Sequence, residues 1–257
     1  QEEYKQLSGV LSKIANVYTV TDLLVKVLDN PVERETLVRK ICITENVMEY
    51  YDTLMEMNST RLAKALIEGL PARINTLTSF LNEDYYALFP LYNFYFTRDA
   101  AVTIGNSALI CKMANKVRMR ESLIMQAIYQ GSGEFTCGII DAYDHSPLNP
   151  NLFMEGGDIL IAREDVLLIG NGIRTSSQGI DFLASRLSAI APQGRRHIIV
   201  QQLPHTPESF IHLDMVFTML DRNKCMVFEP LILGDNQYQT IHIVIDNGKI
   251  VKISSVA

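Results

Sequence analysis

Apolar residues in the first third of the chain follow the period of an amphipathic helix. Between about residues 21 and 82 they recur at intervals of three and four, as in "ERETLVRKI", "ENVMEYYDTLMEM" and "STRLAKALIEGL". The chain before them reads as a helix, "QEEYKQLSGVLSKI", that leads into a strand, "NVYTV". These patterns predict a small all-helical subdomain within an otherwise mixed chain.

After residue 90 the pattern changes to short strands grouped around single helices, in a repeated order. The first group is "FYFTRDAAVTIG", "SALICKM", the helix "RESLIMQAIYQ" and the strand "EFTCGII". The second is "GGDILIA", "DVLLIGNG", the helix "SQGIDFLASRLSAI" and the strand "RHIIVQQ", and a third begins with "HLDMVFTML" and "KCMVFE". An internal β-β-α-β repeat of roughly 55 residues is therefore predicted, which places the chain in the α/β class.

Charged residues recur at the same places in the first two repeats. Asp99 is followed 19 positions later by Arg118, and Glu155 is followed 19 positions later by Arg174. Each acid opens a first strand and each arginine follows a second strand, so repeats arranged around an axis would bring all four to one centre. Each residue alone has a plainer interpretation, such as a surface ion pair, a turn or a basic face. The hypothesis therefore depends on their combination.

The third repeat contributes a histidine and an aspartate within the apolar run "FIHLDMVFTML". Side chains two positions apart on a strand share a face. His212 and Asp214 are therefore expected to point the same way, and Leu213 the opposite way. Taken alone, the pair is equally typical of a polar edge face with one hydrogen-bonded histidine.

Composition and charge favour a water-soluble globular protein over a nucleic-acid-binding or membrane-spanning one. The chain has 257 residues, of which 47% are hydrophobic and 20% charged, and a net charge of −6, so no basic surface is expected. No apolar run approaches the ~20 residues that span a bilayer. The cysteines are scattered among apolar neighbours, which favours reduced, buried thiols in a cytoplasmic protein over a zinc site. They are Cys42, Cys111, Cys137 and Cys225.

The candidate site residues combine carboxylates with guanidinium groups. Acids with a histidine suggest a metal site, but two arginines in the same cleft would repel a divalent ion. Arginine binds a carboxylate through parallel hydrogen bonds, and carboxylates bind a planar cation in the same way. The set therefore favours a ligand with a cation at one end and a carboxylate at the other, which is the shape of free arginine. It comprises Asn93, Asp99, Arg118, Glu155, Asp158, Arg174, His212 and Asp214.

Four motifs in this order, "NFYFTRD", "MEGGD", "GIRT" and "IHLDMVFTM", resemble the arginine deiminase family. The resemblance implies a pentein-like fold, an αβ propeller of repeated ββαβ modules with a helical insertion. It implies a propeller core at residues 1–20 and 89–257 and a helical insertion subdomain at residues 21–88. The family's first strands and its nucleophilic cysteine are expected outside this sequence. Cys225, in an apolar strand, reads as a buried core thiol.

The resemblance implies two catalytic residues, Glu155 and His212, which would pass protons to and from the reacting groups. Because Glu155 directly follows the apolar "NLFM", burial is expected to raise its pKa and suit it to that task. Two aspartates would hold the guanidinium of arginine, and an asparagine and two arginines would hold its α-carboxylate. The implied substrate-binding residues are Asn93, Asp99, Arg118, Arg174 and Asp214.

The implied activity is hydrolysis of L-arginine to L-citrulline and ammonia through a cysteine–thiouronium intermediate. Two alternatives stay open: a protein that binds a guanidino ligand without chemistry, and an amidinotransferase that passes the amidino group to an amine. No metal and no organic cofactor is expected. The expected partner is a small guanidino substrate, with no nucleic acid and no membrane, and a homo-oligomer is left open.

Overall fold

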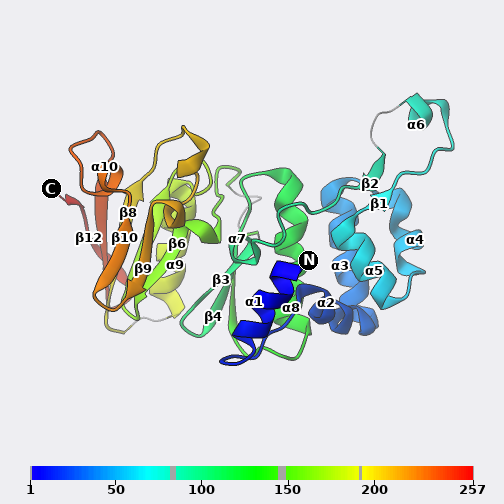
Figure 1. Cartoon of the computed structure of the whole chain (residues 1–257), viewed down its shortest axis with the longest axis horizontal. Coiled ribbons are helices and arrows are strands. Elements are labelled where there is room, and N and C mark those ends of the chain that lie inside the picture. Colours follow the sequence, from blue (N-terminus) through cyan, green and yellow to red (C-terminus); the bar gives the residue numbers. More distant parts are fainter. Residues whose placement is uncertain (1, 82–84, 144–148, 191–192, 257) are drawn as a thin grey trace. The chain divides into compact units, whose positions relative to one another are not determined.

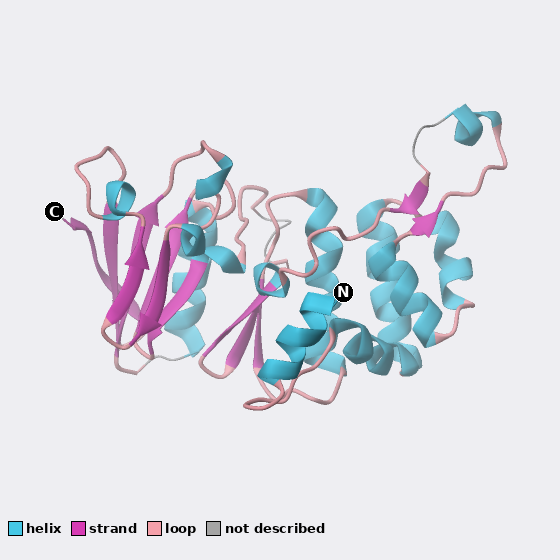
Figure 2. Ribbon diagram, viewed as in Figure 1, coloured by secondary structure: helices cyan, strands magenta, loops and turns pink. Residues whose placement is uncertain are grey.

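The computed structural model describes residues 2–81, 85–143, 149–190 and 193–256. The chain divides into two compact units, one containing residues 1–91 and 127–135 and the other residues 92–126 and 136–257. Helices dominate the first unit, and strands dominate the second (Figure 1, Figure 2).

Polar residues set the ends of the helices in the first unit. Thr19 and Asn58 accept hydrogen bonds from backbone amides at the starts of α2 and α5, and Asn30 does so at the start of α3, just before a proline. Asn46 ends α3 in the left-handed conformation, with φ of 57°. The elements are α1 (Glu2–Leu11), α2 (Val20–Asp29), α3 (Pro31–Glu45), α4 (Tyr51–Met55), α5 (Ser59–Glu68), β1 (Leu70–Pro71), α6 (Leu77–Leu81) and β2 (Tyr86–Leu88).

The helical prediction for residues 21–82 is confirmed as far as Glu68 by α2, α3, α4 and α5 and again by α6, but it is wrong at β1, Leu70–Pro71, which lies between them. Leu24, Leu28, Leu62 and Leu66 on α2 and α5 are at most 1% exposed, and burying each such side chain stabilises the fold by about 1.5–3 kcal/mol. The strand predicted at "NVYTV" is wrong, because the side chain of Thr19 caps α2 and its final valine begins that helix. The domain boundaries drawn from the sequence stay a prediction.

The second unit contains the β-β-α-β repeat twice, so this prediction is confirmed. In the first copy, β3 and β4 pair antiparallel, α8 follows, and β5 returns parallel to β4. In the second copy, β6, β7, α9 and β8 repeat this order and these directions. The bounds of the first copy are β3 (Ala101–Ile104), β4 (Ser107–Ile110), α8 (Met119–Gly131) and β5 (Gly138–Asp141), with the short α7 (Thr97–Ala100) before it. Those of the second are β6 (Ile159–Arg163), β7 (Val166–Asn171), α9 (Ser177–Ile190) and β8 (Arg195–Gln202).

The later strands depart from the repeat. β9 (Phe217–Asp221) and β10 (Lys224–Val227) form a separate hairpin, followed by the short helix α10 (Glu229–Ile232). β11 (Thr240–Asp246) and β12 (Lys249–Val256) instead extend the second sheet, whose order is β12-β11-β8-β7-β6. The unit is therefore mixed α/β, and among the described residues none of its sheets closes on itself.

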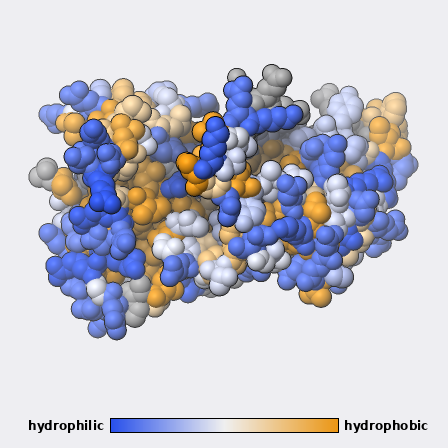
Figure 3. Space-filling view, turned by 60° about the horizontal axis from the view of Figure 1, so that its bottom comes forward, coloured by the Kyte–Doolittle hydropathy of each residue, from blue (hydrophilic) through white to orange (hydrophobic). Residues whose placement is uncertain are grey.

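Alternating side chains on the five-stranded sheet form a core against α9, which contacts β7, β11 and β12. The strand residues that share this face are at most 7% exposed: Leu167, Ile169, Ile198, Val200, Ile243 and Ile245. Near one edge of this core, a groove of about 730 Å³ opens between the β3–β4 and β6–β7 turns, with Ile104, Ile161 and Leu187 in its lining. Figure 3 brings this end of the molecule forward and shows an apolar hollow beside hydrophilic surface.

Candidate active site

Each of the two repeats, and also the hairpin β9–β10, has one polar residue shortly before its first strand. Asp99 lies in α7 and is separated from β3 by Ala100, and Glu155 precedes the single turn Gly156–Asp158 that leads into β6. His212 precedes the single turn Leu213–Met215, which comes just before β9. Asp99, Glu155 and His212 are each at most 7% exposed. The repeat therefore brings together residues that are far apart in the sequence.

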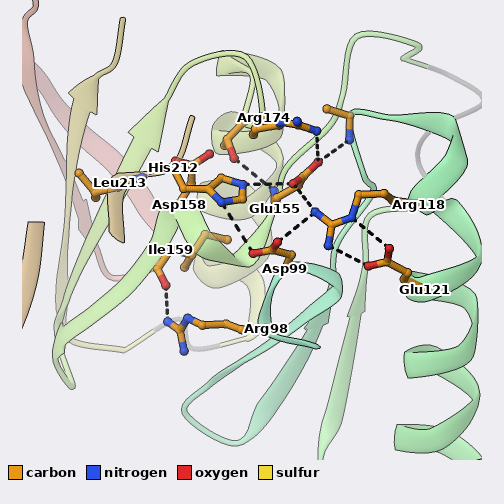
Figure 4. A network of polar contacts seen from close by, with 12 residues as sticks. Arg98, Asp99, Arg118, Glu121, Glu155, Asp158, Ile159, Arg174, His212 and Leu213 are labelled. Carbon is orange, nitrogen blue, oxygen red and sulfur yellow. Dashed lines mark hydrogen bonds and ion pairs between the residues drawn. The ribbon is translucent and has the colours of Figure 1, made fainter. Parts of the chain in front are cut away.

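Hydrogen bonds and ion pairs join these side chains into one network (Figure 4). Nε2 of His212 lies 3.1 Å from Oε2 of Glu155, and its Nδ1 lies 3.8 Å from Oδ1 of Asp99. Nη1 of Arg118 bridges the two acids, 3.0 Å from Oδ2 of Asp99 and 3.2 Å from Oε2 of Glu155. Nη1 of Arg174 lies 3.7 Å from the other oxygen of Glu155. Five of the predicted site residues thus meet in one cluster.

Glu155 and His212 form a charged pair. Burial alone would raise the pKa of Glu155, but its hydrogen bond with His212 and the two nearby arginines outweigh burial, so the pKa lies below its usual value. Burial would likewise lower the pKa of His212, but Glu155 and the neighbouring aspartates raise it. The expectation that burial raises the pKa of Glu155 is therefore wrong. The histidine, not the glutamate, holds the proton in this pair.

Glu121 belongs to the cluster although the sequence did not single it out. Its carboxylate accepts two hydrogen bonds from Arg118, from Nε at 3.0 Å and from Nη2 at 2.8 Å, and the residue is 1% exposed. Burial opposes the charge on Arg118, but Glu121 and the other carboxylates raise its pKa above the usual value. Because Glu121 holds one edge of the guanidinium, the other edge faces Asp99 and Glu155. The i,i+3 spacing in "RMRE" is the sequence signal that could have identified this residue.

The two glycines of "EGGD" are required by the close approach of other atoms. A Cβ on Gly156 would clash with the carbonyl oxygen of Arg98, and a Cβ on Gly157 would stand 2.5 Å from Nδ1 of His212. Neither glycine has a positive φ, so backbone freedom does not explain them. The plain-turn interpretation is therefore insufficient, because glycine lets the histidine ring lie directly against this backbone.

The structure corrects the strand predicted around His212. Residues Leu213–Met215 form a single 3-10 turn, and β9 starts only at Phe217. His212 and Leu213 are both buried, whereas Asp214 is exposed. The predicted alternation, with His212 and Asp214 on one face, is therefore wrong, because the backbone here turns where the apolar pattern suggested an extended strand.

Two predicted substrate-binding residues lie outside the network. Asn93 and Asp214 are exposed, and within the described residues no side-chain hydrogen bond joins either of them to the cluster. Although Asp214 is accessible to solvent, the protein around its carboxyl partly desolvates it and raises its pKa, and the positive charge of His212 opposes that shift. Asp214 is thus close enough to the histidine to be influenced by it. The roles of both residues stay predictions.

Asp99, Glu155 and His212 offer ligand atoms that lie within 4.8 Å of one another, a spacing compatible with a metal ion. Arg118, however, already places a cationic nitrogen between the two carboxylates. A divalent ion there would be repelled by the guanidinium. Arg118 therefore opposes binding of a metal ion at these three ligands.

The cysteines differ from one another more than the sequence predicted. Cys42 and Cys111 are buried, Cys137 is intermediate, and Cys225 is exposed on β10. The interpretation of Cys225 as a core thiol is wrong, because the β9–β10 hairpin leaves this position open to solvent. Burial, reinforced by the charges of Glu155 and Asp99, holds the pKa of Cys111 well above its usual value, so this thiol stays protonated.

Comparison with known proteins shows to which family the chain belongs. The family model described as arginine deiminase matches residues 1–256. The chain belongs to the arginine deiminase family. The arginine deiminase of Listeria innocua is 35% identical over 184 residues, covering 69% of this chain and 44% of the relative. Arginine deiminase 1 of Staphylococcus epidermidis is 29% identical over 265 residues, covering 97% of this chain and 63% of the relative.

A further relative, from Listeria welshimeri, is 31% identical and covers 84% of this chain and 54% of its own length. The chain thus spans about half the length of the curated relatives it matches. Among solved structures, the N-terminal domain of a cyanobacterial arginine dihydrolase shares 25% identity over 53% of this chain and 44% of that domain, with a TM-score of 0.42. Dimethylarginine dimethylaminohydrolase from Pseudomonas aeruginosa shares 19% identity over 52% and 46%, also with a TM-score of 0.42. The family resemblance seen in the motifs is confirmed by the family model and the deiminase sequences.

Within the described residues, no helix has the length and apolar character to cross a membrane.

Proposed function

We propose that this chain supplies the guanidinium-binding and proton-transferring groups of an arginine deiminase. The reaction is hydrolysis of L-arginine to L-citrulline and ammonia. The observation that carries the proposal is the buried pair of Glu155 and His212, 3.1 Å apart and beside Asp99. A protonated histidine next to a carboxylate that can hold a guanidinium is what departure of ammonia requires.

In this proposal the substrate enters with its guanidinium towards Asp99 and Asp214. Arg174 suits the α-carboxylate, because its side chain is 26% exposed and its contact with Glu155 is a long one, at 3.7 Å. Arg118 has a harder task, since it is already paired with three carboxylates. It would need to release Asp99 or Glu155 before binding a substrate carboxylate. Asn93, exposed at the surface, completes the proposed carboxylate-binding group.

The proposed chemistry proceeds through a covalent thiouronium. A guanidinium carbon is a weak electrophile, so a thiolate attacks it while the carboxylates hold its plane. The carbon–nitrogen bond to one terminal nitrogen then breaks, and His212 gives its proton to the departing ammonia. Neutral His212 next takes a proton from water, whose oxygen attacks the same carbon. The carbon–sulfur bond then breaks and the hydroxyl proton leaves to solvent, which releases citrulline and restores the thiolate.

The four cysteines of this chain fit the attacking role poorly. Cys111 is fully buried and its raised pKa keeps it protonated. Cys225 is exposed on a hairpin, and none of the four is bonded to the cluster among the described residues. The proposal therefore assigns the thiolate to a cysteine outside these 257 residues.

The propeller arrangement belongs to the same proposal. It is supported by the two β-β-α-β copies and by the third hairpin, β9–β10, each preceded by a member of the cluster. Modules related by rotation about one axis would place equivalent positions side by side, as Asp99, Glu155 and His212 are. Further modules would then complete the ring.

Binding of a guanidino ligand without chemistry is the second candidate. The poor fit of all four cysteines to the nucleophile role favours it. The two candidates share the cluster and differ only in whether a thiolate reaches the bound guanidinium.

The test is citrulline formation from L-arginine by the purified full-length protein, so that the proposed cysteine is included, with L-arginine binding measured by calorimetry. Glu155→Gln removes one negative charge from the cluster, and Glu164→Gln, at the exposed β6–β7 turn, is the matched control. Citrulline made by the wild type and the control but not by Glu155→Gln supports the deiminase. Binding without citrulline supports the second candidate, and absence of both overturns the proposal.

Cys225→Ala is assayed beside them. Equal citrulline production by this variant and the wild type supports a nucleophile elsewhere. If the wild type makes citrulline and Cys225→Ala does not, the protein is a deiminase whose nucleophile is Cys225, which would contradict our assignment.

A further inference from the structure

Asp158, the last residue of "EGGD", is buried beneath the cluster without belonging to its ion pairs. It is 0% exposed, and its Oδ1 accepts a hydrogen bond of 2.9 Å from the amide of Leu213, the residue directly after His212. Figure 4 shows it beside His212, on the side away from Arg118. A buried carboxylate costs several kcal/mol unless its surroundings compensate, so its presence calls for an explanation.

Asp158 lies close in the chain to Glu155 and is hydrogen-bonded to the residue that follows His212. It holds the amide of Leu213, and this fixes the start of the turn on which His212 sits. Burial raises the pKa of Asp158 to about 7, and the charge of His212 and the hydroxyl of Thr175 oppose that shift. The oxygen of the same hydroxyl accepts a hydrogen bond of 3.2 Å from the amide of Glu155. Asp158 thus lies between the segment that carries Glu155 and the turn that follows His212, and it is hydrogen-bonded to that turn.

The surrounding chain leaves room for this carboxyl and for little else. A Cβ on Gly170 of β7 would clash with Oδ1 of Asp158, so glycine there is required for the carboxyl to reach the Leu213 amide. The other oxygen, Oδ2, is buried and has no hydrogen-bond partner among the described residues. The hydrogen bond that the structure shows for this carboxyl goes to the turn that follows His212.

We infer that Asp158 is a positioning residue, which sets the distance between Glu155 and His212 by holding the Leu213 amide. It touches neither substrate nor reacting atoms, and it acts through the turn that carries the histidine. This inference rests on the proposed function for its effect on catalysis, but not for its effect on the geometry of His212. A shift of about 1 Å in a catalytic group can lower a rate on the order of 100-fold.

The two oxygens of Asp158 allow a sharp comparison of variants. Asp158→Asn keeps an oxygen that accepts the Leu213 amide and loses only the charge, whereas Asp158→Ala removes the acceptor. If positioning is the role, Asp158→Asn keeps kcat for citrulline formation within a few-fold of the wild type, and Asp158→Ala lowers kcat on the order of 100-fold with KM nearly unchanged. Equal kcat in both variants and the wild type would overturn the inference.

A second measurement does not depend on activity. In the NMR spectrum, the Leu213 amide proton should move to higher field in Asp158→Ala but not in Asp158→Asn, because only the alanine variant loses the hydrogen bond. The pKa of His212, followed by its ring proton, should fall in Asp158→Ala, because the histidine loses both a nearby carboxylate and its placement against Glu155. Thermal unfolding of each variant establishes that it is folded.

The outcomes separate the two proposals. A wild type that makes no citrulline, together with a shifted Leu213 amide and a lowered His212 pKa in Asp158→Ala, contradicts the proposed function but supports the positioning role. An unmoved Leu213 amide and an unchanged His212 pKa in a folded Asp158→Ala protein overturn the positioning role, whatever the activity of the wild type.

Discussion

Replacing Arg118 by methionine should destabilise the protein in a pH-dependent way. The guanidinium is 3.2 Å or less from three carboxylates, those of Asp99, Glu121 and Glu155, which are at most 6% exposed. Methionine matches much of the side-chain length but leaves the three acids without their shared cation. Removing one partner of a buried ion pair costs about 3–5 kcal/mol, so we expect a loss of at least this order in the free energy of unfolding near pH 7.5.

The loss should be smaller near pH 5. Without Arg118 the three acids repel one another and are poorly solvated, so they take up protons more readily than in the wild type. Protonation relieves part of the penalty as the pH falls. Urea unfolding followed by circular dichroism at pH 5 and pH 7.5 measures both values.

The matched control is Arg163→Met. Arg163 also forms a two-fold hydrogen bond with an acid, Asp165, but its side chain is 69% exposed. Exposed pairs of this kind contribute little to stability, so the free energy of unfolding of this variant should equal that of the wild type at both pH values. An Arg118→Met protein that loses the same free energy at both pH values would refute the reasoning, because the loss would then come from packing and not from the uncompensated acids.

Three smaller changes test other parts of the structure. Gly157→Ala should lower the free energy of unfolding by about 1–3 kcal/mol in urea, because the new methyl group displaces the ring of His212; a Gly9→Ala control, where a Cβ meets nothing within 4 Å, should not. In the folded protein the pKa of His212 is raised from 6.5 and that of Glu155 is lowered from 4.5. Their pairing therefore stabilises the fold fully between pH 4.5 and pH 6.5. This stabilisation is lost as the pH rises through the folded-state pKa of His212, or falls through that of Glu155. In His212→Ala the alkaline loss should be absent from a series of urea unfolding curves. Asn58→Ala should cost about 1 kcal/mol by removing the cap of α5, seen as a lower unfolding temperature, whereas the conservative Asn58→Ser should restore most of it.

Periodicity and repeat order predicted most of the fold. The helix at "SQGIDFLASRLSAI" and the strand within "RHIIVQQ" have the predicted positions, because each is a continuous pattern bounded by polar residues. The turn at Leu213–Met215 was missed, because its apolar residues alternate as they would in a strand while its conformation is fixed by a distant contact, the hydrogen bond to Asp158. Local sequence does not reveal a partner 55 residues away.

The convergence of Asp99, Arg118, Glu155 and Arg174 could be predicted from the shared spacing within the repeats. The charge states could not, because the shift in the pKa of Glu155 reflects a balance between burial and neighbouring cations that depends on distances of 3.1–3.7 Å. Glu121 escaped notice for the same reason: an acid in the first turn of a helix is ordinarily exposed, and only the packed structure shows this one buried against Arg118.

The cluster also has a bearing on how the protein folds. Its members come from chain segments attached to two different sheets, since Asp99 precedes a strand of the three-stranded sheet and Glu155 a strand of the five-stranded one. During folding, contacts between such distant segments are expected to form late. The entropy of loop closure is lost in forming both sheets before the acids can contact Arg118. A ligand that binds at the cluster would therefore recognise only chains in which both sheets are complete, and its binding energy would be added to the cohesion between them. The site thus links the two sheets, and a bound ligand would indicate that the whole second unit is folded.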